Sequence, residues 1–222
     1  MIMLNTPVII VNYKTYGASI GEEALELTKI IEEESEKTWA VCPQAPDIRM
    51  HSENTDVPLL AQHIDPIGPG SNTGHILLEG VIDAGVEGTL INHSEKRLKL
   101  SAIEKIVARC KEHDMDTIIC ANNPEVAASA AALSPDFVAY EPPELIGGDI
   151  SVSTAKPEVV EEAVRRVKDV DPQVKVLCGA GVKNGEDVKS ALDLGTEGVL
   201  LASGLVKAEK KKRVIEDLES GI

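Results

Sequence analysis

The sequence predicts a closed barrel of eight parallel β-strands ringed by helices, a (β/α)8 fold in which residues 1–222 form one domain. Three observations predict it. Short apolar segments alternate with amphipathic segments, no long linker separates them, and 222 residues are enough for one large core. The residues are 43% hydrophobic and only 2% aromatic, which indicates a mainly aliphatic core. An open, doubly wound sheet is the alternative arrangement.

The expected strands are short runs of apolar residues that are rich in β-branched side chains. Amphipathic segments lie between most of them, and this alternation is the basis for expecting parallel strands. The eight runs are Val8–Val11, Trp39–Cys42, Leu59–Ala61, Gly88–Ile91, Thr117–Cys120, Phe137–Tyr140, Val174–Cys178 and Gly198–Leu201.

The expected helices are marked by apolar periodicity and by signals at their ends. Ile20–Glu34 gathers leucine and isoleucine side chains near one face. Ser101–His113 opens with a serine that a glutamate follows three residues later, which is a capping-box pattern. Pro157–Lys168 begins with a proline suited to the first helical position, and Asp187–Leu194 precedes Gly195, a suitable C-cap. The helical signal after the second and third strands is weak.

Charge and composition exclude several functional classes. A formal net charge of −15 argues against nucleic-acid binding, because such proteins present a basic face. The acidic excess indicates solubility or adaptation to a salty cytoplasm. The basic run Lys207–Arg213 is typical of a solvated last helix, with binding to an anionic partner as the alternative. No segment has the roughly 20 apolar residues of a membrane span, and Met1–Pro7 lacks the features of a signal peptide. We therefore expect a cytoplasmic protein.

The four cysteines are scattered and form no CxxC pair, so small buried thiols are expected, with a disulfide or metal site as the alternative. No HExxH motif, P-loop or carboxylate–histidine cluster is present, and no metal is expected. The segment Gly179–Gly185 has glycines at a GxGxxxG spacing and no acidic ribose partner, which argues against a dinucleotide cofactor. The cysteines are Cys42, Cys110, Cys120 and Cys178.

Polar and small residues follow five of the expected strands, where a barrel of this kind places its reactive groups. Lys14 follows the first strand, His93 the fourth and Glu141 the sixth. Gly179–Gly181 and Ala202–Gly204 follow the last two strands, where backbone N–H groups and a helix N-terminus can bind phosphate. Each element alone is compatible with an exposed side chain or a tight turn. Their joint occurrence at one face predicts an active site.

Together these motifs resemble the triosephosphate isomerase family, and the short chain is similar to its archaeal branch. The resemblance covers essentially the whole chain in order and spacing. It implies a TIM barrel that interconverts dihydroxyacetone phosphate and glyceraldehyde 3-phosphate in glycolysis and gluconeogenesis, without a cofactor. The motifs are Asn-Tyr-Lys at 12–14, Asn-His-Ser-Glu-Lys-Arg at 92–97, Tyr-Glu-Pro-Pro-Glu-Leu-Ile-Gly at 140–147 and Leu-Leu-Ala-Ser-Gly at 200–204.

The resemblance also implies catalytic roles. Glu141 is expected to be the base that moves a proton between two carbons, and His93 the neutral electrophile that polarises the carbonyl. A helix N-terminus at Ser94 would disfavour the imidazolium form of that histidine. Lys14 is expected to stabilise the enediolate and attract the phosphate, Asn12 to hold the substrate oxygen, and Glu95 to pair with the lysine.

Substrate binding is implied for a further set of residues. Tyr13 is expected to contribute mainly backbone contacts and packing. Pro142 and Pro143 stiffen the start of a loop that glycines free further on, as in a lid that excludes water. The lid residues Ile146 and Gly147, and the backbone donors Gly181, Ala202 and Ser203, are expected to contact the phosphate.

Two sequence features bear on which function and which assembly are expected. The family commonly has Thr-Gly where this chain has Gly148-Asp149, and Asp149 adds a negative charge that opposes binding of a dianion unless it points outward. A non-catalytic phosphate-binding scaffold is therefore the alternative function. A different barrel enzyme acting on phosphorylated sugars lacks a well-placed lysine or carboxylate pair. Ile67–His75 resembles the loop that enters a neighbouring subunit, which implies a homotetramer or homodimer; a surface loop is the alternative.

Overall fold

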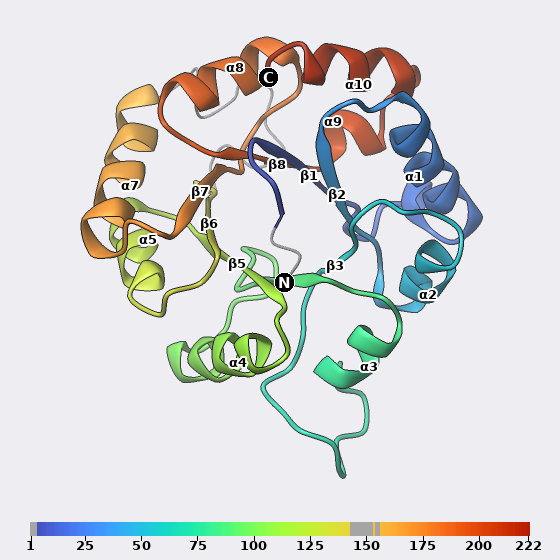
Figure 1. Cartoon of the computed structure of the whole chain (residues 1–222), viewed down its shortest axis with the longest axis vertical. Coiled ribbons are helices and arrows are strands. Elements are labelled where there is room, and N and C mark those ends of the chain that lie inside the picture. Colours follow the sequence, from blue (N-terminus) through green and yellow to red (C-terminus); the bar gives the residue numbers. More distant parts are fainter. Residues whose placement is uncertain (1–3, 143–152, 154–155) are drawn as a thin grey trace.

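Eight parallel strands curl into a barrel in the computed structural model, which describes residues 4–142, 153 and 156–222 (Figure 1). The strand order is β2-β1-β8-β7-β6-β5-β4-β3, so the last strand pairs with the first. A parallel bridge between Val41 and Leu59 joins the two ends of this order, and the Val41 N–H donates to the Pro58 carbonyl over 3.0 Å. The arrangement confirms the predicted barrel and not the open sheet.

All eight strands lie where the sequence predicts them, with ends that differ by one residue at most. The third is the shortest because only two of its residues form regular ladder pairs with its neighbour. The strands are β1 (Val8–Asn12), β2 (Thr38–Cys42), β3 (Leu60–Ala61), β4 (Gly88–Ile91), β5 (Asp116–Ala121), β6 (Phe137–Tyr140), β7 (Lys175–Cys178) and β8 (Gly198–Leu201).

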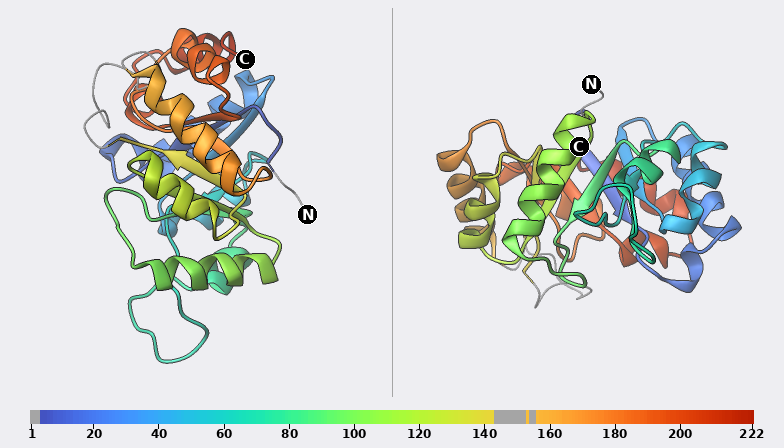
Figure 2. Two further views of the ribbon diagram at one scale, coloured as in Figure 1. Left: turned by 90° about the vertical axis from the view of Figure 1, so that its left-hand side faces the viewer. Right: turned by 90° about the horizontal axis from the view of Figure 1, so that it is seen from below.

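Helices surround the strands on the outside of the barrel, as two further views show (Figure 2). The weak helical signal after β2 and β3 corresponds to helices of only five and six residues, α2 and α3. The helices are α1 (Glu22–Glu34), α2 (Ile48–Ser52), α3 (Leu78–Asp83), α4 (Leu100–Glu112), α5 (Pro124–Ala131), α7 (Pro157–Val170), α8 (Gly185–Asp193), α9 (Ser203–Val206) and α10 (Lys211–Glu219), with 3-10 turns η1 (Gly17–Ser19) and η2 (Ala45–Asp47).

Some predicted helix ends are wrong. The N-cap of α4 is Lys99, whose carbonyl accepts the first hydrogen bonds, so Ser101 lies inside the helix and forms no capping box. Helix α8 starts two residues before Asp187, because the Asn184 side chain accepts the Asp187 N–H over 2.8 Å and caps it there. Pro157 does begin α7, and Gly195 follows α8 with a positive φ of 90°, both as predicted.

The core has two layers, which follow from the alternation of side chains along each strand. In β1, Val8 and Ile10 point into the barrel, whereas Ile9 and Val11 point out towards the helices. In the other strands the inward layer is likewise mostly aliphatic, with Phe137 as its one aromatic member. The rule continues past the strand ends, so residues two positions beyond an inward side chain also face the barrel mouth.

A buried carboxylate lies near the N-terminal ends of the strands, opposite the predicted site. Asp116 is only 3% exposed and accepts the Leu4 N–H over 2.8 Å. Burial raises its pKa from 3.8 to about 6, which outweighs the lowering effect of that hydrogen bond, and the charge of Asp136 raises it further. Ionisation of Asp116 therefore opposes folding.

All four cysteines are buried and free, as predicted. Burial raises the pKa of the Cys110 and Cys178 thiols to about 12, so they stay protonated at neutral pH. Across residues 4–142, 153 and 156–222, no helix is both long and apolar enough to cross a membrane.

Candidate active site

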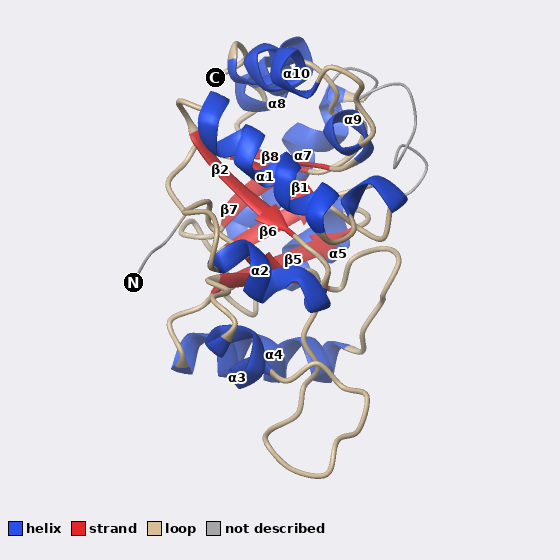
Figure 3. Cartoon of the chain, turned by 90° about the vertical axis from the view of Figure 1, so that its right-hand side faces the viewer, coloured by secondary structure: helices blue, strands red, loops and turns tan. Residues whose placement is uncertain are grey.

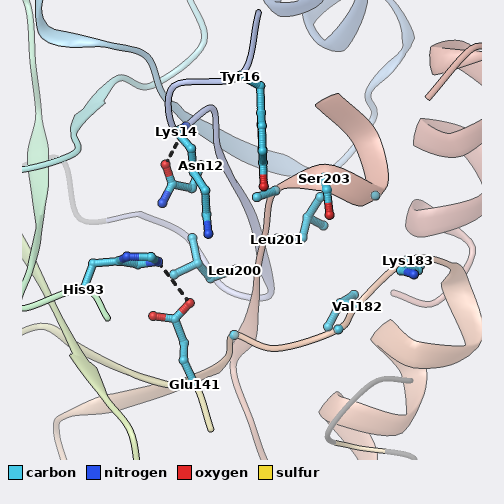
Figure 4. Close-up of a pocket in the computed structure, with 14 residues that line it drawn as sticks. Asn12, Lys14, Tyr16, His93, Glu141, Val182, Lys183, Leu200, Leu201 and Ser203 are labelled. Carbon is cyan, nitrogen blue, oxygen red and sulfur yellow. Dashed lines mark hydrogen bonds and ion pairs between the residues drawn. The ribbon is translucent and has the colours of Figure 1, made fainter. Parts of the chain in front are cut away.

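A pocket lies at the C-terminal ends of the strands, where the barrel mouth gathers the predicted residues (Figure 4). Asn12 and Glu141 extend the inward rows of β1 and β6, because each lies two residues beyond an inward-facing core residue. Gly179, Ala202 and Ser203 come from the ends of β7 and β8. The pocket is therefore built by residues that the strand alternation directs to one place.

Glu141 is held almost out of contact with water. It is 4% exposed, and its Oε1 lies 3.6 Å from Nε2 of His93, longer than a hydrogen bond (Figure 4). Its Oε2 is buried and has no hydrogen-bond partner within the described parts of the chain. A Cβ at position 179 would lie 2.4 Å from the Glu141 Cγ, so only glycine there leaves room for this side chain.

The second group of the site is His93, whose Nδ1 accepts the Glu95 backbone N–H over 3.2 Å. A backbone N–H can only donate, so this bond favours the neutral ring with its proton on Nε2, which faces Glu141. The expected helix N-terminus at Ser94 is wrong: the Lys96 N–H closes a turn onto the His93 carbonyl, and α4 begins only at Leu100. A local hydrogen bond, and not a helix N-terminus, therefore selects which ring nitrogen carries the proton in the neutral form.

Lys14 reaches the pocket from an unusual backbone conformation, with a φ of +48°. Its N–H donates to Asn12 Oδ1 over 2.9 Å, and its Nζ lies 3.1 Å from Glu95 Oε1. The Lys14 carbonyl accepts the Gln62 Nε2–H, and Gln62 also donates to the Cys42 carbonyl, both over 2.9 Å. Gln62 thus fixes the strained turn that aims the lysine.

Asn92 holds the histidine turn in a similar way. Its φ is +63°, a conformation that asparagine tolerates better than most residues. Its side chain donates to the Cys120 carbonyl over 3.0 Å and accepts the Leu98 N–H over 2.9 Å. Sequence reasoning missed Gln62 and Asn92 as positioning residues. The inward row of each strand was the available signal, since each lies two residues beyond an inward leucine.

The other end of the pocket is suited to an anion. Gly181 has a φ of +75° and lines it together with Ala202 and Ser203. Helix α9 begins at Ser203, and the first N–H groups of a helix have no acceptor within the helix. Lys183 adds a positive charge at this end. Backbone donors and a cation together make a site for phosphate.

Of the predicted binding residues, Tyr13 lies outside the pocket, and two others fall outside the described part of the chain. The Tyr13 ring is fully buried in the outer core layer, and its hydroxyl is 2.7 Å from Thr28 Oγ1. It therefore packs beside the loop that carries Lys14, in line with the packing role expected for it. Ile146 and Gly147, together with Asp149, lie outside the described residues.

Two thiols lie behind the carboxylate. Burial first, and then the charge of Glu141, raise the pKa of Cys42 and Cys120 above the ordinary range. A hydrogen bond to Glu141 raises the pKa of Cys120 further. The thiols therefore remain neutral, and they add no second negative charge beside Glu141.

The arrangement is suited to moving a proton next to a carbonyl in a small anionic molecule. It combines a buried carboxylate base, a neutral imidazole N–H, an ammonium group and backbone donors for phosphate. Within the described residues, no three or more His, Cys, Asp or Glu side chains lie together as a metal site.

Comparison with known proteins identifies the same family that the sequence motifs resemble. A family model described as Triosephosphate isomerase matches residues 7–218. The chain is 56% identical to the Triosephosphate isomerase of Methanothermus fervidus over 218 residues, which are 97% of this chain and 98% of that one. It is 57% identical to the protein of the same name from Methanocaldococcus jannaschii, over 95% of this chain and 97% of the other. The identity to that of Methanosarcina barkeri is 51%, over 97% and 98% of the two chains.

Proposed function

Because the chain belongs to the triosephosphate isomerase family, we propose that it interconverts dihydroxyacetone phosphate and glyceraldehyde 3-phosphate through an enediolate. The observation that carries this proposal is the pairing of the Glu141 carboxylate with the Nε2 side of His93, 3.6 Å apart, beside a phosphate-suited pocket end. That pairing supplies a base and an acid to two adjacent atoms of one small substrate.

Each group has a role in this reaction. Glu141 takes a proton from the carbon beside the carbonyl and returns it to the neighbouring carbon. The Nε2–H of His93 donates to the substrate oxygens, which carry the negative charge of the enediolate. The Lys14 ammonium stabilises the same charge, and its contact with Glu95 sets its position. Asn12 fixes the lysine backbone and lines the pocket beside it.

A coupled assay of glyceraldehyde 3-phosphate isomerisation tests the proposal. The intact protein is expected to turn over, and Glu141→Gln is expected to lose at least about 100-fold in kcat, since general-base catalysis contributes 10² to 10⁴. Equal unfolding temperatures of the two proteins serve as the fold control. A folded wild-type protein that binds phosphate without turnover would refute the enzyme and leave the phosphate-binding scaffold.

We also propose that the protein is a homotetramer, with a homodimer as the alternative. The exposed loop 67–75 projects beyond α3 and α4 (Figure 3). Arg109 anchors its base by donating to the Ile67 carbonyl and pairing with Glu79. A second hollow beside Lys14 and Glu95 gives such a loop a place to enter in a neighbouring copy. Light scattering of the protein in solution tests this, and a monomer at micromolar concentration would contradict it.

The cellular setting is a proposal too. Four free, buried thiols are typical of a protein in a reducing compartment, which supports the cytoplasm. The reaction would act there in glycolysis and gluconeogenesis. The near-complete mutual coverage with the methanogen relatives supports an archaeal-type short chain. Fractionation of cells of the source organism, followed by isomerase assay of the soluble and membrane fractions, tests the location.

A further inference from the structure

Tyr16 lines the anion end of the pocket and is not among the residues that move the proton or stabilise the enediolate. It follows Lys14 by two residues and comes from the loop after β1. In Figure 4 its ring stands between Lys14 and Ser203, with the hydroxyl end on the Ser203 side. No hydrogen-bond partner of this hydroxyl is found in residues 4–142, 153 and 156–222, in contrast to the paired hydroxyl of Tyr13.

The backbone of Tyr16 is fixed, so the ring has a defined place. Its carbonyl accepts the N–H of Ser19 over 3.0 Å and the Ser19 hydroxyl over 2.9 Å. The side chain is half-buried and packs against the outer core layer. A ring held in this way keeps its hydroxyl at the pocket without a large loss of rotational freedom on binding.

A lysine from another loop covers the face of this ring. Lys207 Nζ lies 4.3 Å from the centroid of the Tyr16 ring, which is within the range of a cation–π interaction. No ion pair joins Lys207 to an acidic side chain in the described part of the chain. Its positive charge is therefore free to act on a nearby anion, and the cation–π contact helps to hold the Tyr16 ring in place.

The position of Lys207 ties it to the pocket. Lys207 is the C-cap of helix α9, the four-residue helix that starts at Ser203. Its N–H donates to the Ser203 carbonyl over 3.2 Å. The same short helix thus presents its first N–H groups to the pocket and places its terminal lysine over Tyr16. Strands β1 and β8 are neighbours, so this contact joins the two loops that enclose the anion end.

We propose that Tyr16 is a further substrate-contacting residue, which donates its hydroxyl to the phosphate group, and that Lys207 is a positioning residue acting through the Tyr16 ring. The inference rests on the proposed function, because it takes a phosphorylated triose as the ligand. A dianion gains a hydrogen bond from the hydroxyl and attraction from the ammonium group behind it.

The test begins with three single variants of the protein. Tyr16→Phe removes the hydroxyl and keeps the ring, whereas Lys207→Gln removes the charge and keeps most of the side chain's length. The matched control is Lys210→Gln, an exposed lysine three residues further on that lines neither hollow at the barrel mouth. It changes net charge by the same amount.

Two measurements are made on each protein. The first is the rise in unfolding temperature with added inorganic phosphate, which gives a dissociation constant without any need for turnover. The second is KM and kcat for glyceraldehyde 3-phosphate at low and high salt. If the wild type binds phosphate but does not isomerise the triose, the proposed function fails. The phosphate measurement then still tests whether Tyr16 and Lys207 contribute to anion binding.

For Tyr16→Phe we expect the dissociation constant for phosphate and the KM for the triose each to rise roughly tenfold, which is the effect of losing one hydrogen bond to a charged group. For Lys207→Gln we expect a weakening of about two- to fivefold that shrinks at high salt, with kcat changed less than KM. In a Tyr16→Leu background, Lys207→Gln should add little, because the ring through which it acts is gone.

Three results would overturn the proposal. Wild-type phosphate affinity in Tyr16→Phe would exclude the hydroxyl contact. Equal effects of Lys207→Gln and Lys210→Gln would reduce the role of Lys207 to net charge. A purely structural contact would lower the unfolding temperature and leave the salt dependence of kcat/KM as in the wild type, which would also refute it.

Discussion

A methyl group added at position 179 tests whether the buried pose of Glu141 is the one that catalyses. In Gly179→Ala the new Cβ would lie 2.4 Å from Glu141 Cγ and 3.1 Å from its Cδ. Carbon atoms normally approach to about 3.5–4.0 Å, so the carboxylate must retreat by more than about 1 Å. A displacement of about 1 Å costs roughly 100-fold in rate, which corresponds to a barrier higher by about 2.7 kcal/mol.

The assay is kcat for glyceraldehyde 3-phosphate isomerisation, measured beside the unfolding temperature. The fold is expected to survive, because the Gly179 N–H still donates to the Tyr140 carbonyl at the end of β6. The matched control is Gly80→Ala in helix α3, where the new Cβ meets only Leu77 Cβ at 3.9 Å. That variant should keep the wild-type kcat and gain slightly in stability.

A second experiment places Gly179→Ala in the Glu141→Gln background. In Glu141→Gln the carboxylate base is already absent, so Gly179→Ala should add little further loss, and the two effects should not add. A Gly179→Ala enzyme with near-normal kcat would refute the account, since the base would then work from a displaced position. A full additive loss in the double variant would show that glycine acts on something other than Glu141.

Three further predictions concern the supports of the site and the fold. Asp116→Asn should stabilise the protein by about 3 kcal/mol above pH 6 and little near pH 4. The folded pKa of about 6 exceeds the ordinary 3.8, so the contribution of Asp116 to wild-type stability is fully present below pH 4 and is lost as pH rises through 6. Urea unfolding of both proteins at both pH values checks this, and equal shifts would contradict it. Gln62→Leu should lower kcat/KM about tenfold by freeing the strained Lys14 turn, and an unchanged value with a wild-type unfolding temperature would dismiss that role. Glu219→Ala should cost about 1–2 kcal/mol of unfolding free energy, because the part-buried Trp39 Nε1–H loses its acceptor, while the exposed N–H groups of Glu36 and Lys37 bond water instead. We expect kcat to be unaffected. Fluorescence of this single tryptophan reports the transition, and an unaltered midpoint would contradict the prediction.

Much of the barrel could be predicted because its signal is local. Apolar, β-branched runs mark the strands, and the side-chain alternation that directs Ile10 inward also directs Asn12 to the mouth. The helix starts were harder to predict. The capping pattern at Ser101 is not used. Helix α4 begins instead with the carbonyl of Lys99 as its first acceptor, and the sequence pattern does not distinguish this residue from its neighbours.

The supports of the site could not be predicted, because they depend on contacts between distant parts of the chain. Gln62 bonds carbonyls that lie 20 and 48 residues earlier, and nothing near it in the sequence indicates this. The fit of Glu141 against Gly179 likewise joins two strands through a close approach. The neutral form of His93 was expected from a helix N-terminus at Ser94, but the structure has a turn there and α4 begins only at Leu100.

One buried carboxylate, Glu141, is expected to carry the proton between two carbons of the substrate. Isomerisation in deuterated water, followed by NMR, tests this expectation. In the wild type we expect product that keeps the transferred hydrogen, together with product that carries at most one deuterium at the receiving carbon, where the proton on Glu141 has exchanged with solvent. Both should form at a rate that falls together with turnover in Glu141→Gln. Exchange that persists at the wild-type rate in the folded Glu141→Gln protein would contradict the expectation and assign the proton transfer to another group.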